Sequence, residues 1–338
     1  MLEQAPALSE VGAGLQVAPN GARVLDALGV RLRHLESRAV HLIDGPTGRG
    51  LARMPLGPGF RLAHRADLVE ALAGAARAAG ARIVTGRRVL DVAEGRLLTD
   101  EGPVPAARVV GADGARGACR AFVVPEHAPR FTGQVAWRAL LPLTRPWPAE
   151  AQVHVGRGRH LVLYPLRDGR LLNVVAVEER AGWAAEGWSQ RDDPAALRAA
   201  FAGYAAPVRD LLARVERVFL WGLMDHGASA RWTRGGVTLI GDAAHPTLPF
   251  LAQGANLALE DAWTLAARLD DPAGWEAARR PRVARALDAA AANARAYHLG
   301  GPRRALAHLA LRLAGATAPG LLLRRYRWLY DHDATADG

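Results

Sequence analysis

The chain has 338 residues, half of them apolar, and a formal net charge of +10. This length can bury a substantial core in one large domain or in two interleaved ones. No apolar run approaches the roughly 18 residues needed to cross a membrane, which predicts no stable membrane insertion. All 43 basic residues are arginines scattered without an aromatic-interleaved cluster, so the charge does not predict a nucleic-acid partner.

Cysteine usage points to a reducing compartment. The one cysteine, Cys119, excludes an internal disulfide framework, and we expect no signal peptide because the charged and apolar pattern is missing. We therefore expect a cytoplasmic protein in which Cys119 is an inert side chain. The eleven histidines are dispersed, without paired ligand spacing backed by carboxylates, so no metal site is expected.

Helical periodicity opens the chain. It predicts one helix over 19–29 and a second over 66–80, capped at Asp67 or Ala66 and ended by Gly80. Short strand-like runs follow at 81–86, 88–95, 96–100 and 107–114.

A second region of strands follows, and its hairpin has a recognisable turn. The pair Asp168-Gly169 favours a tight type I′ turn between two apolar runs. A helix is predicted over 194–214, and mostly helix follows Gly254 to the end of the chain. The predicted strands of this region are 133–143, 160–166, 171–179 and 217–223.

The order of these elements predicts an α/β fold. Strands and helices alternate, a hairpin sheet interrupts them, and the first pattern then resumes. This order divides the chain into a nucleotide-binding domain (1–130 and 225–300), an inserted substrate-binding sheet domain (131–224) and a helical tail (301–338). We expect the basic, amphipathic tail to be a packing element or a homodimer contact rather than a membrane-surface helix.

Three segments carry chemistry. In "VTLIGDAAHPTLPFLAQGANLALEDA" (237–262), Asp242 ends a strand and can hydrogen-bond a polyol. The helix opened by Gly254 directs its N–H groups and dipole toward an anionic or electron-rich group. Near the N-terminus, Glu3 ends an apolar run and can accept hydrogen bonds from both hydroxyls of an adenosine ribose. The third segment is a strand that ends in "GADG", with Asp113.

These segments resemble the FAD-dependent aromatic hydroxylases, single-component flavoprotein monooxygenases that include salicylate and 6-hydroxynicotinate hydroxylases. The motifs that carry the resemblance are "LEQAP…GAGLQVAPN", "HRADL", "GADGARG", "HLVLYPL" and "GDAAHPTLPFLAQGANLALEDA", and together they span essentially the whole chain. The resemblance implies a Rossmann-like FAD-binding domain of the GR2 type, an inserted β-sheet substrate domain and a helical C-terminus.

The resemblance also implies roles for polar residues around the cofactor. Glu3 would bind the adenosine ribose with Gln4 beside it, and Asp242 would bind the ribityl chain. Arg65 of "HRADL" would reach FAD, and Asp113 matches a position linked to both FAD and the nicotinamide cofactor.

Other residues are assigned to the flavin ring. The backbone of Gly254, Ala255 and Asn256 would face the carbonyl edge of the isoalloxazine, and Pro249 would shape the loop near the reactive flavin edge. Gln16 replaces a histidine of the pyridine-hydroxylating relatives. A glutamine cannot act as a base, but it can hydrogen-bond the substrate or the flavin.

The substrate candidates lie in the inserted sheet. His160 and Tyr164 are four residues apart in "HLVLYPL" and would share one face of a strand, either as pocket residues or as an edge histidine and a half-buried tyrosine. Arg138 is a further polar candidate. His245 precedes a proline in the 237–262 motif, and we expect it to hold the turn rather than to act as a base.

One departure from the family concerns the start of the chain. In the family, about 30 residues precede the position of Glu3 and carry the first strand, the G-x-G-x-x-G turn and the first helix. "GAGLQVAPNG" (12–21) does not replace that turn, because it follows the acidic residue and lacks the third glycine. We expect either a recorded start that is too late or an N-terminally truncated member.

The resemblance implies an FAD- and NAD(P)H-dependent monooxygenase. O2 and a flavin C4a-hydroperoxide would hydroxylate a small aromatic substrate, either a phenol or an aromatic acid. One alternative is another FAD oxidoreductase of this fold, although the W-x-W-x-I-P signature of halogenases is missing. A second alternative is a flavin-deficient homologue that serves as a binding or scaffold protein.

Overall fold

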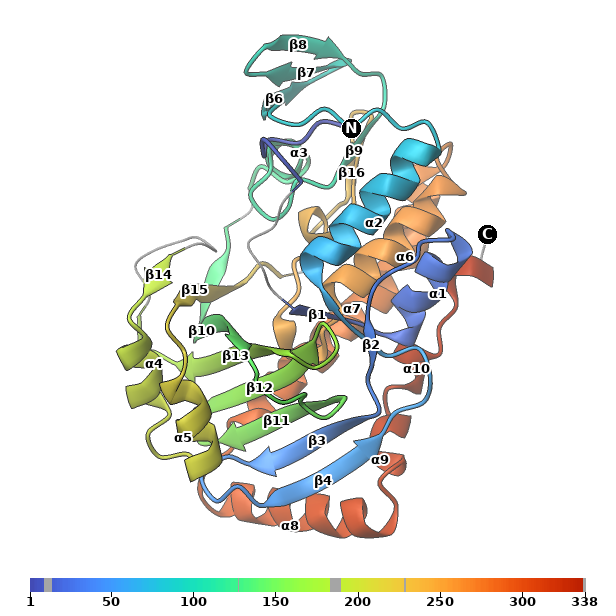
Figure 1. Cartoon of the computed structure of the whole chain (residues 1–338). Helices are drawn as coiled ribbons and strands as arrows, with labels where there is room; N and C mark the ends of the chain where they lie inside the picture. Colours follow the sequence, from blue (N-terminus) through green and yellow to red (C-terminus); the bar gives the residue numbers. More distant parts are fainter. Residues whose placement is uncertain (9–13, 127, 183–189, 228, 337–338) are drawn as a thin grey trace.

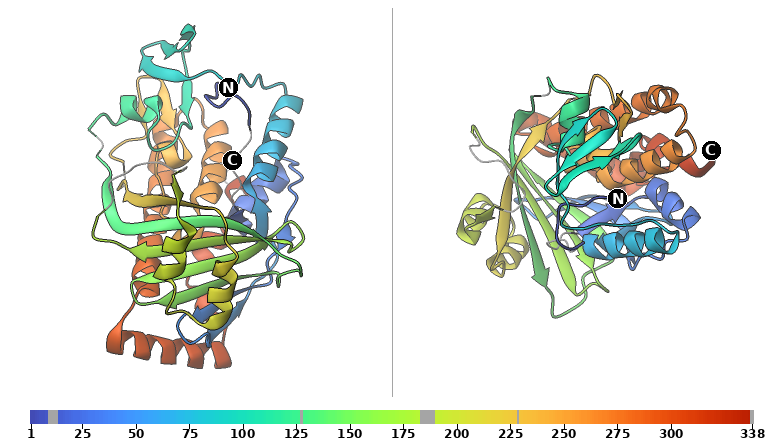
Figure 2. Two further views of the ribbon diagram at one scale, coloured as in Figure 1. Left: turned by 60° about the vertical axis from the view of Figure 1, so that its left-hand side comes forward. Right: turned by 90° about the horizontal axis from the view of Figure 1, so that it is seen from above.

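The computed structural model describes residues 1–8, 14–126, 128–182, 190–227 and 229–336. The protein has the mixed α/β fold that the sequence predicts, with one large sheet and helices on both sides of it (Figure 1). Two views from other directions show a layer of long helices above the large sheet and a smaller antiparallel sheet farthest from it (Figure 2).

An eight-stranded sheet forms the centre of the lower half of the molecule. Neighbouring strands are antiparallel except β11 and β3, which are parallel. The order is β14 (Arg191–Asp192), β15 (Val218–Asp225), β10 (Arg130–Pro142), β13 (Leu171–Glu179), β12 (Arg159–Leu166), β11 (Glu150–Gly156), β3 (Ala39–Asp44) and β4 (Gly50–Pro55). The four strands expected between 131 and 224 are present, but β3 and β4 come from the segment that the sequence assigned to the nucleotide-binding domain.

The two faces of this sheet have different partners, because side chains alternate along each strand. One face packs against α4 (Pro194–Ala200) and α5 (Ala206–Ala213), through the odd-numbered positions of β10 and β12 and the even-numbered ones of β13. This core includes Val135, Trp137, Ala139, Leu141, Leu161, Leu163, Leu172, Val174 and Ala176. The opposite face is left for a cavity.

One local prediction in this region needs correction. The helix expected over 194–214 is two helices, because the chain turns after Ala200 and restarts with Pro207 in the first turn of α5, where a missing N–H is tolerated. The tight turn expected at Asp168-Gly169 is present, because both residues have positive φ (62° and 80°) and the N–H of Arg170 donates to the carbonyl of Arg167 at 3.3 Å. Arg167 also has positive φ (47°), and the N–H of Gly169 donates to the carbonyl of Leu166.

The second layer contains α1 (Pro19–Ala27), α2 (Arg65–Ala78), α6 (Gly254–Ala266) and α7 (Pro272–Tyr297) (Figure 1). The helices expected over 19–29 and 66–80 are therefore confirmed. The cap of α2 is His64, whose side chain accepts from the N–H of Ala66, and not Asp67 or Ala66 as predicted. The chain leaves α2 through Gly80 at φ +87°.

Three small sheets complete this half. They are β1 (Gly14–Val17), β5 (Arg61–His64) and β2 (Leu35–Glu36); β16 (Thr233–Arg234), β17 (Val237–Leu239) and β9 (Val109–Gly111); and β6 (Val89–Ala93), β7 (Arg96–Thr99) and β8 (Gly102–Pro105). The strand expected over 81–86 is reduced to one parallel bridge between Leu2 and Val84. The remaining elements are α3 (Ala118–Val123), η1 (Gly241–Ala243), η2 (Pro249–Leu251) and η3 (Ala334–Ala336).

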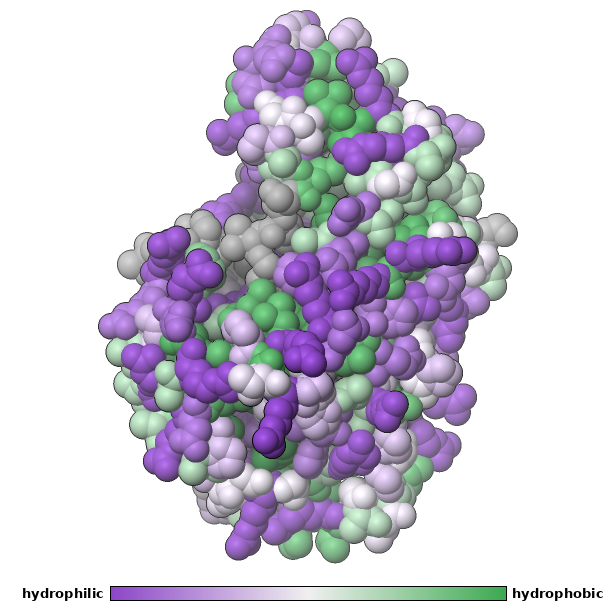
Figure 3. Space-filling model, in the orientation of Figure 1, coloured by the Kyte–Doolittle hydropathy of each residue, from purple (hydrophilic) through white to green (hydrophobic). Residues whose placement is uncertain are grey.

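The C-terminal tail forms α8 (Gly301–Thr317), α9 (Leu321–Arg324) and α10 (Arg327–Tyr330). α8 packs so closely on β4 that a Cβ on Gly315 would lie 2.9 Å from Ala52. Its outer face exposes Leu306, Leu309 and Leu313, and Figure 3 shows hydrophobic side chains at the lower edge, where Figure 1 places α8. Within the described residues no helix combines the length and apolarity of a membrane span. Dimerisation through this tail stays a prediction.

A buried charge network joins α6 to α7. Glu260 and Asp261 are fully buried, and Arg279 donates to both carboxylates at 2.9–3.0 Å. Arg282 donates a further pair of hydrogen bonds to Glu260. Burial acts to raise the pKa of Glu260, but these arginines outweigh it and hold that pKa below its usual value.

We predict that Arg279→Met destabilises the protein by about 3–5 kcal/mol, because it leaves two buried carboxylates short of positive charge. Chemical denaturation followed by circular dichroism measures the loss. Arg327→Met is the control: its partner Asp331 lies in an exposed i,i+4 pair, so the expected loss is at most about 1 kcal/mol. Equal stability of the two variants would contradict a stabilising role for the network.

Candidate functional site

A cavity of about 930 Å³ lies between the open face of the large sheet and the N-terminal end of α6. Six strands supply its floor, again by alternation, and the helical layer and the C-terminal helices supply its walls. The floor residues are Arg138, Val175, Val177, His160, Val162, Tyr164, Ala151, Val153, Val40, Leu42 and Met54. Adjacent residues on β12 therefore face either the core or the cavity.

The wall at α6 presents backbone donors and a carboxylate. Gly254 and Ala255, the first residues of α6, line the cavity together with Asp242. A Cβ on Gly254 would lie 2.9 Å from the hydroxyl oxygen of Thr247 and 3.7 Å from a carboxylate oxygen of Asp242, so this corner needs a glycine. The helix dipole and free N–H groups at this end favour a carbonyl or an anion.

Asp261 holds the loop that carries Asp242. Its carboxylate accepts from the N–H of Gly241 at 3.0 Å and lies 2.5 Å from Nε2 of His245. Burial acts to raise the pKa of Asp261, but His245 and Arg279 outweigh it and lower that pKa. His245 is buried and lies outside the cavity lining, which agrees with the structural role expected from the sequence.

Arg120 also holds the loop that carries Asp242. It is almost completely buried, and its guanidinium donates to the carbonyl oxygens of Ala243 and Ala244. Nothing in the sequence motif "GACR" marked this role, because the partners are backbone carbonyls more than 120 residues away. Together, Arg120 and Asp261 leave the side chain of Asp242 directed to the cavity.

The cavity end near Asp242 also contains Arg65, the first residue of α2. Burial raises the pKa of Asp242, and Arg65 acts against that rise. The carboxylate of Asp242 can accept hydrogen bonds from hydroxyl groups of a ligand, and Arg65 adds positive charge beside it.

The sheet side of the cavity holds His160 and Tyr164, on one face of β12 as the sequence predicted. Burial, and then the neighbouring His298, lowers the pKa of His160 well below its usual value, so the imidazole is neutral at pH 7. Burial raises the pKa of Tyr164, and Arg138 acts in the opposite direction. The tyrosine is therefore a neutral hydroxyl donor.

Arg138 is the cation that the floor contributes from β10. Its guanidinium carbon lies 4.9 Å from the ring centre of Trp221, a cation–π geometry that fixes the side chain.

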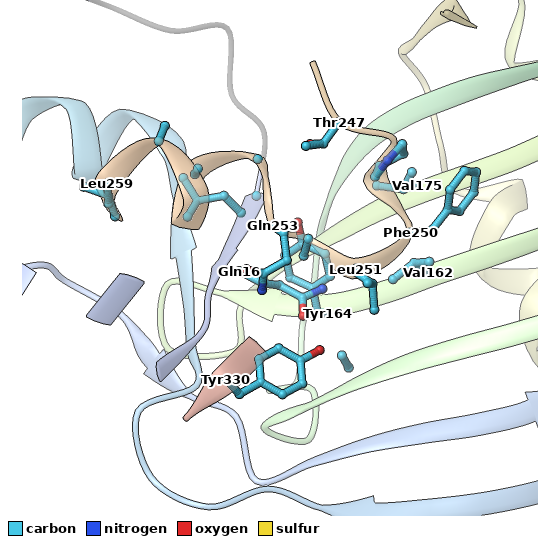
Figure 4. A pocket seen from close by; sticks show the side chains of 18 of the residues that line it. Gln16, Val162, Tyr164, Val175, Thr247, Phe250, Leu251, Gln253, Leu259 and Tyr330 are labelled. Atoms are coloured by element: carbon cyan, nitrogen blue, oxygen red, sulfur yellow. The ribbon is translucent and has the colours of Figure 1, made fainter. Parts of the chain in front are cut away.

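Glutamine side chains meet at the centre of the cavity. Figure 4 shows Gln16, Gln253 and Tyr164 close together, with Tyr330 directed toward the same space. Gln253 is buried and lines the cavity, its Oε1 accepts from Asn20, and its Nε2 has no hydrogen-bond partner in the protein. The motif "AQGAN" contains Gln253, but nothing in the sequence distinguishes this amide from other polar residues. A buried amide without an acceptor fits a ligand carbonyl or ring nitrogen.

Four of the residues predicted for the cofactor lie outside this cavity lining. The carboxylate of Glu3 accepts from the N–H of Ala5, and Gln4 is exposed beside it. Asp113 accepts from the N–H of Cys119 at the start of α3. Burial, together with Asp113, raises the pKa of the Cys119 thiol to about 12, so the thiol is unreactive.

Asn256 is the fourth; the role expected of its backbone stays a prediction, while its side chain has a structural role. It is fully buried, accepts from the N–H of Ala18 and donates to the carbonyls of Gln16 and Ala252. Asn256 thus joins β1 to the loop before α6 and supports Ala252, which adopts a left-handed conformation at φ +53°. The other predicted residues, Gln16, Arg65, His160, Tyr164, Asp242, Pro249, Gly254 and Ala255, all line the cavity.

The polar groups around α6 fit FAD. One cavity wall carries the carboxylate of Asp242, which suits ribityl hydroxyls, and the N–H groups of α6, which suit a ring carbonyl. The same wall carries the amide of Gln253, whose Nε2 has no partner in the protein. The cavity floor, on β10 and β12, holds His160, Tyr164 and Arg138. One cavity can therefore hold a flavin ring and a second, smaller ring.

Comparison with known proteins agrees with this geometry. Residues 23–280 match the family described as "FAD binding domain". The 3-amino-4-hydroxybenzoate 2-monooxygenase of Streptomyces cremeus is 37% identical, over 88% of this chain and 81% of its own length. The 3-hydroxybenzoate 6-hydroxylase 1 of Aquipseudomonas alcaligenes is 31% identical, over 98% of this chain and 90% of its own.

A solved structure shares the fold. It is titled "Salicylate hydroxylase substrate complex" and superposes with a TM-score of 0.81, covering 96% of this chain and 89% of the other at 22% identity. The matched family and these relatives cover the FAD-binding elements and the large sheet alike. This chain belongs to the FAD-dependent aromatic hydroxylases and is an FAD-dependent monooxygenase.

Proposed function

We propose that the protein uses NAD(P)H and O2 to hydroxylate a small phenolic aromatic acid of the hydroxybenzoate class. The observation that carries the proposal is that the polar end of α6 and the polar floor of the sheet share one cavity. The relatives named above act on amino- and hydroxybenzoates, which supports the substrate class. The single, buried cysteine supports the cytoplasmic location proposed from the sequence.

FAD, when bound, supplies the oxygen chemistry, and the protein supplies binding, orientation and proton transfer. Asp242 would hold the ribityl hydroxyls, with Arg65 beside it. Gly254 and Ala255 would present the N–H groups of α6 to the ring carbonyl edge, and Gln253, whose Nε2 has no hydrogen-bond partner in the protein, would donate to the same ring. Pro249 shapes the loop that closes this end.

His160 is the group we assign to remove the phenol proton. Its Nδ1 lies 2.7 Å from Nε2 of His298, so Nε2 of His160 is the nitrogen left for a molecule in the cavity. A neutral imidazole accepts a proton there, and a phenolate is the electron-rich form of the ring. Tyr164 donates a hydrogen bond that holds the ring in place.

Arg138 is the group we assign to bind the carboxylate of the substrate. It projects from the cavity floor on β10, which pairs directly with β13. The strand after β13 in the sheet is β12, which carries His160. Arginine pairs with carboxylates through two parallel hydrogen bonds, which would orient the ring relative to His160.

We predict that Asp242→Ala weakens FAD binding by roughly tenfold to hundredfold, the usual effect of losing hydrogen bonds to a charged group. Fluorescence titration of the apoprotein with FAD measures the affinity. Asp288→Ala, at an exposed position of α7, is the control and should bind FAD as the wild type does. Unchanged affinity in Asp242→Ala would remove Asp242 from the cofactor site.

We predict that Arg138→Gln weakens binding of 3-amino-4-hydroxybenzoate by about tenfold or more. It should leave the affinity for 3-amino-4-hydroxybenzamide unchanged, because the amide carries no charge to pair with the arginine. Flavin fluorescence quenching measures both dissociation constants. An equal loss for acid and amide would show that Arg138 shapes the cavity without binding a carboxylate.

We predict that His160→Gln and Tyr164→Phe lower hydroxylation while FAD stays bound. The loss should reach about a hundredfold for His160→Gln, the lower range for general base catalysis, and be smaller for Tyr164→Phe. A loosely held ring also uncouples NAD(P)H oxidation from hydroxylation, so the H2O2 released per NAD(P)H consumed should rise. Product is measured by mass spectrometry and peroxide by a coupled assay. Normal turnover in both variants would assign the two residues to packing.

A further inference from the structure

A chain of three side chains leads from the cavity to the surface. Nδ1 of His160 lies 2.7 Å from Nε2 of His298, and Nδ1 of His298 lies 2.8 Å from a carboxylate oxygen of Glu179. The side chain of His298 is 3% exposed, whereas that of Glu179 is 54% exposed. One end of the chain therefore lies in the cavity wall and the other in solvent.

Three separate elements build this chain. His160 is on β12, Glu179 is the last residue of β13, and His298 follows the C-terminus of α7. The backbone fixes the corner, because the N–H of Gly158 donates to the carbonyl of His298 and the carbonyl of Gly158 accepts from the N–H of Glu179.

Hydrogen-bond chemistry sets the direction of every proton in the chain. The carboxylate of Glu179 can only accept, so Nδ1 of His298 carries the hydrogen and Nε2 of His298 is an acceptor. His160 then donates from Nδ1, and its Nε2 carries the lone pair. That arrangement presents Nε2 of His160 to the cavity as a base. At the other end, it presents the carboxylate of Glu179 to water as a proton acceptor.

We propose that His160, His298 and Glu179 form a proton relay that carries the phenol proton from the cavity to solvent. The proposal rests on the proposed function, which assigns His160 as the base. The phenol O–H bond breaks and the Nε2–H bond of His160 forms. The Nδ1 proton of His160 moves to Nε2 of His298, the Nδ1 proton of His298 moves to the carboxylate of Glu179, and Glu179 releases it to water. A proton returning along the same path to the product restores both imidazoles.

The surroundings of the relay contain few other charges. Burial lowers the pKa of His298, and Glu179 acts to raise it. Arg159 on β12 is the positive group that acts on His298, and it is paired with Glu178. On the other elements, Gln134 of β10 lies 3.4 Å from Nδ1 of His298, and the rings of Tyr297 and Phe250 pack against His160 at a tilt; these three groups are uncharged at neutral pH.

The matched variants are Glu179→Gln and Glu178→Gln. Both remove one carboxylate from neighbouring residues of β13, but Glu178 is bound to Arg159 and Arg180. His298→Gln keeps a polar side chain that cannot pass a proton along, and Glu179→Asp keeps the carboxylate. The FAD-loaded protein is mixed with 3-hydroxybenzoate, and formation of the bound phenolate is followed by ultraviolet difference spectroscopy, in time and against pH.

We expect Glu179→Gln and His298→Gln to slow phenolate formation by about tenfold or more, a fraction of the usual effect of a general base. The pH midpoint should move upward, because the loss of the carboxylate makes the histidines weaker bases. The dissociation constant of 3-hydroxybenzoate should change by less than about twofold, which separates proton transfer from a packing defect. Glu179→Asp should restore the rate, and Glu178→Gln should behave as the wild type.

Three results would overturn the relay, and they have different consequences for the proposed function. Wild-type rates in Glu179→Gln and His298→Gln, with no phenolate in His160→Gln, would reject the relay and keep His160 as the base. A wild-type rate in His160→Gln would reject the base and the relay together. A wild-type protein that never forms the phenolate of a hydroxybenzoate would reject the proposed substrate activation and, with it, the relay.

Discussion

The carboxylate of Asp261 is the interaction on which the site depends. It lies inside the protein at the second turn of α6, and it accepts from the backbone of Gly241, from His245 and from Arg279. These bonds fold the segment between β17 and α6 back onto the helix that follows it. As a result, Asp242 points outward to the cavity while Asp261 points inward. The two aspartates in "GDAAHP…LED" therefore have opposite roles, one toward a ligand and one toward the loop.

Much of the fold follows from local patterns in the sequence. The period of apolar residues predicted α1 and α2, and strand alternation predicted β10, β12, β13 and β15. Long-range pairing was not visible in this way. β3 joins the large sheet as a parallel neighbour of β11, which starts more than 100 residues later in the chain. Such a contact depends on the shape of the whole core, and a single sequence carries no signal for it.

The candidate site was predictable where motifs and faces coincide. His160 and Tyr164 line the cavity because a spacing of four residues keeps side chains on one face of a strand. Residues that act through backbone carbonyls or through each other were not predictable. Arg120 holds a loop by its carbonyl oxygens, and His298 meets His160 only because α7 ends above β12. These partners are joined by tertiary packing, and no sequence spacing links them.

The alternation of side chains in the large sheet also bears on how substrate range can change over evolution. Val162 and Val175 face the cavity, while their chain neighbours Leu163 and Val174 face the core beneath α4 and α5. Substitutions at the first pair alter the volume and polarity offered to a ring without disturbing the packed layer. Substitutions at the second pair open voids in that layer and cost stability. Selection for a new substrate and selection for a stable fold therefore act on adjacent positions with little interference between them.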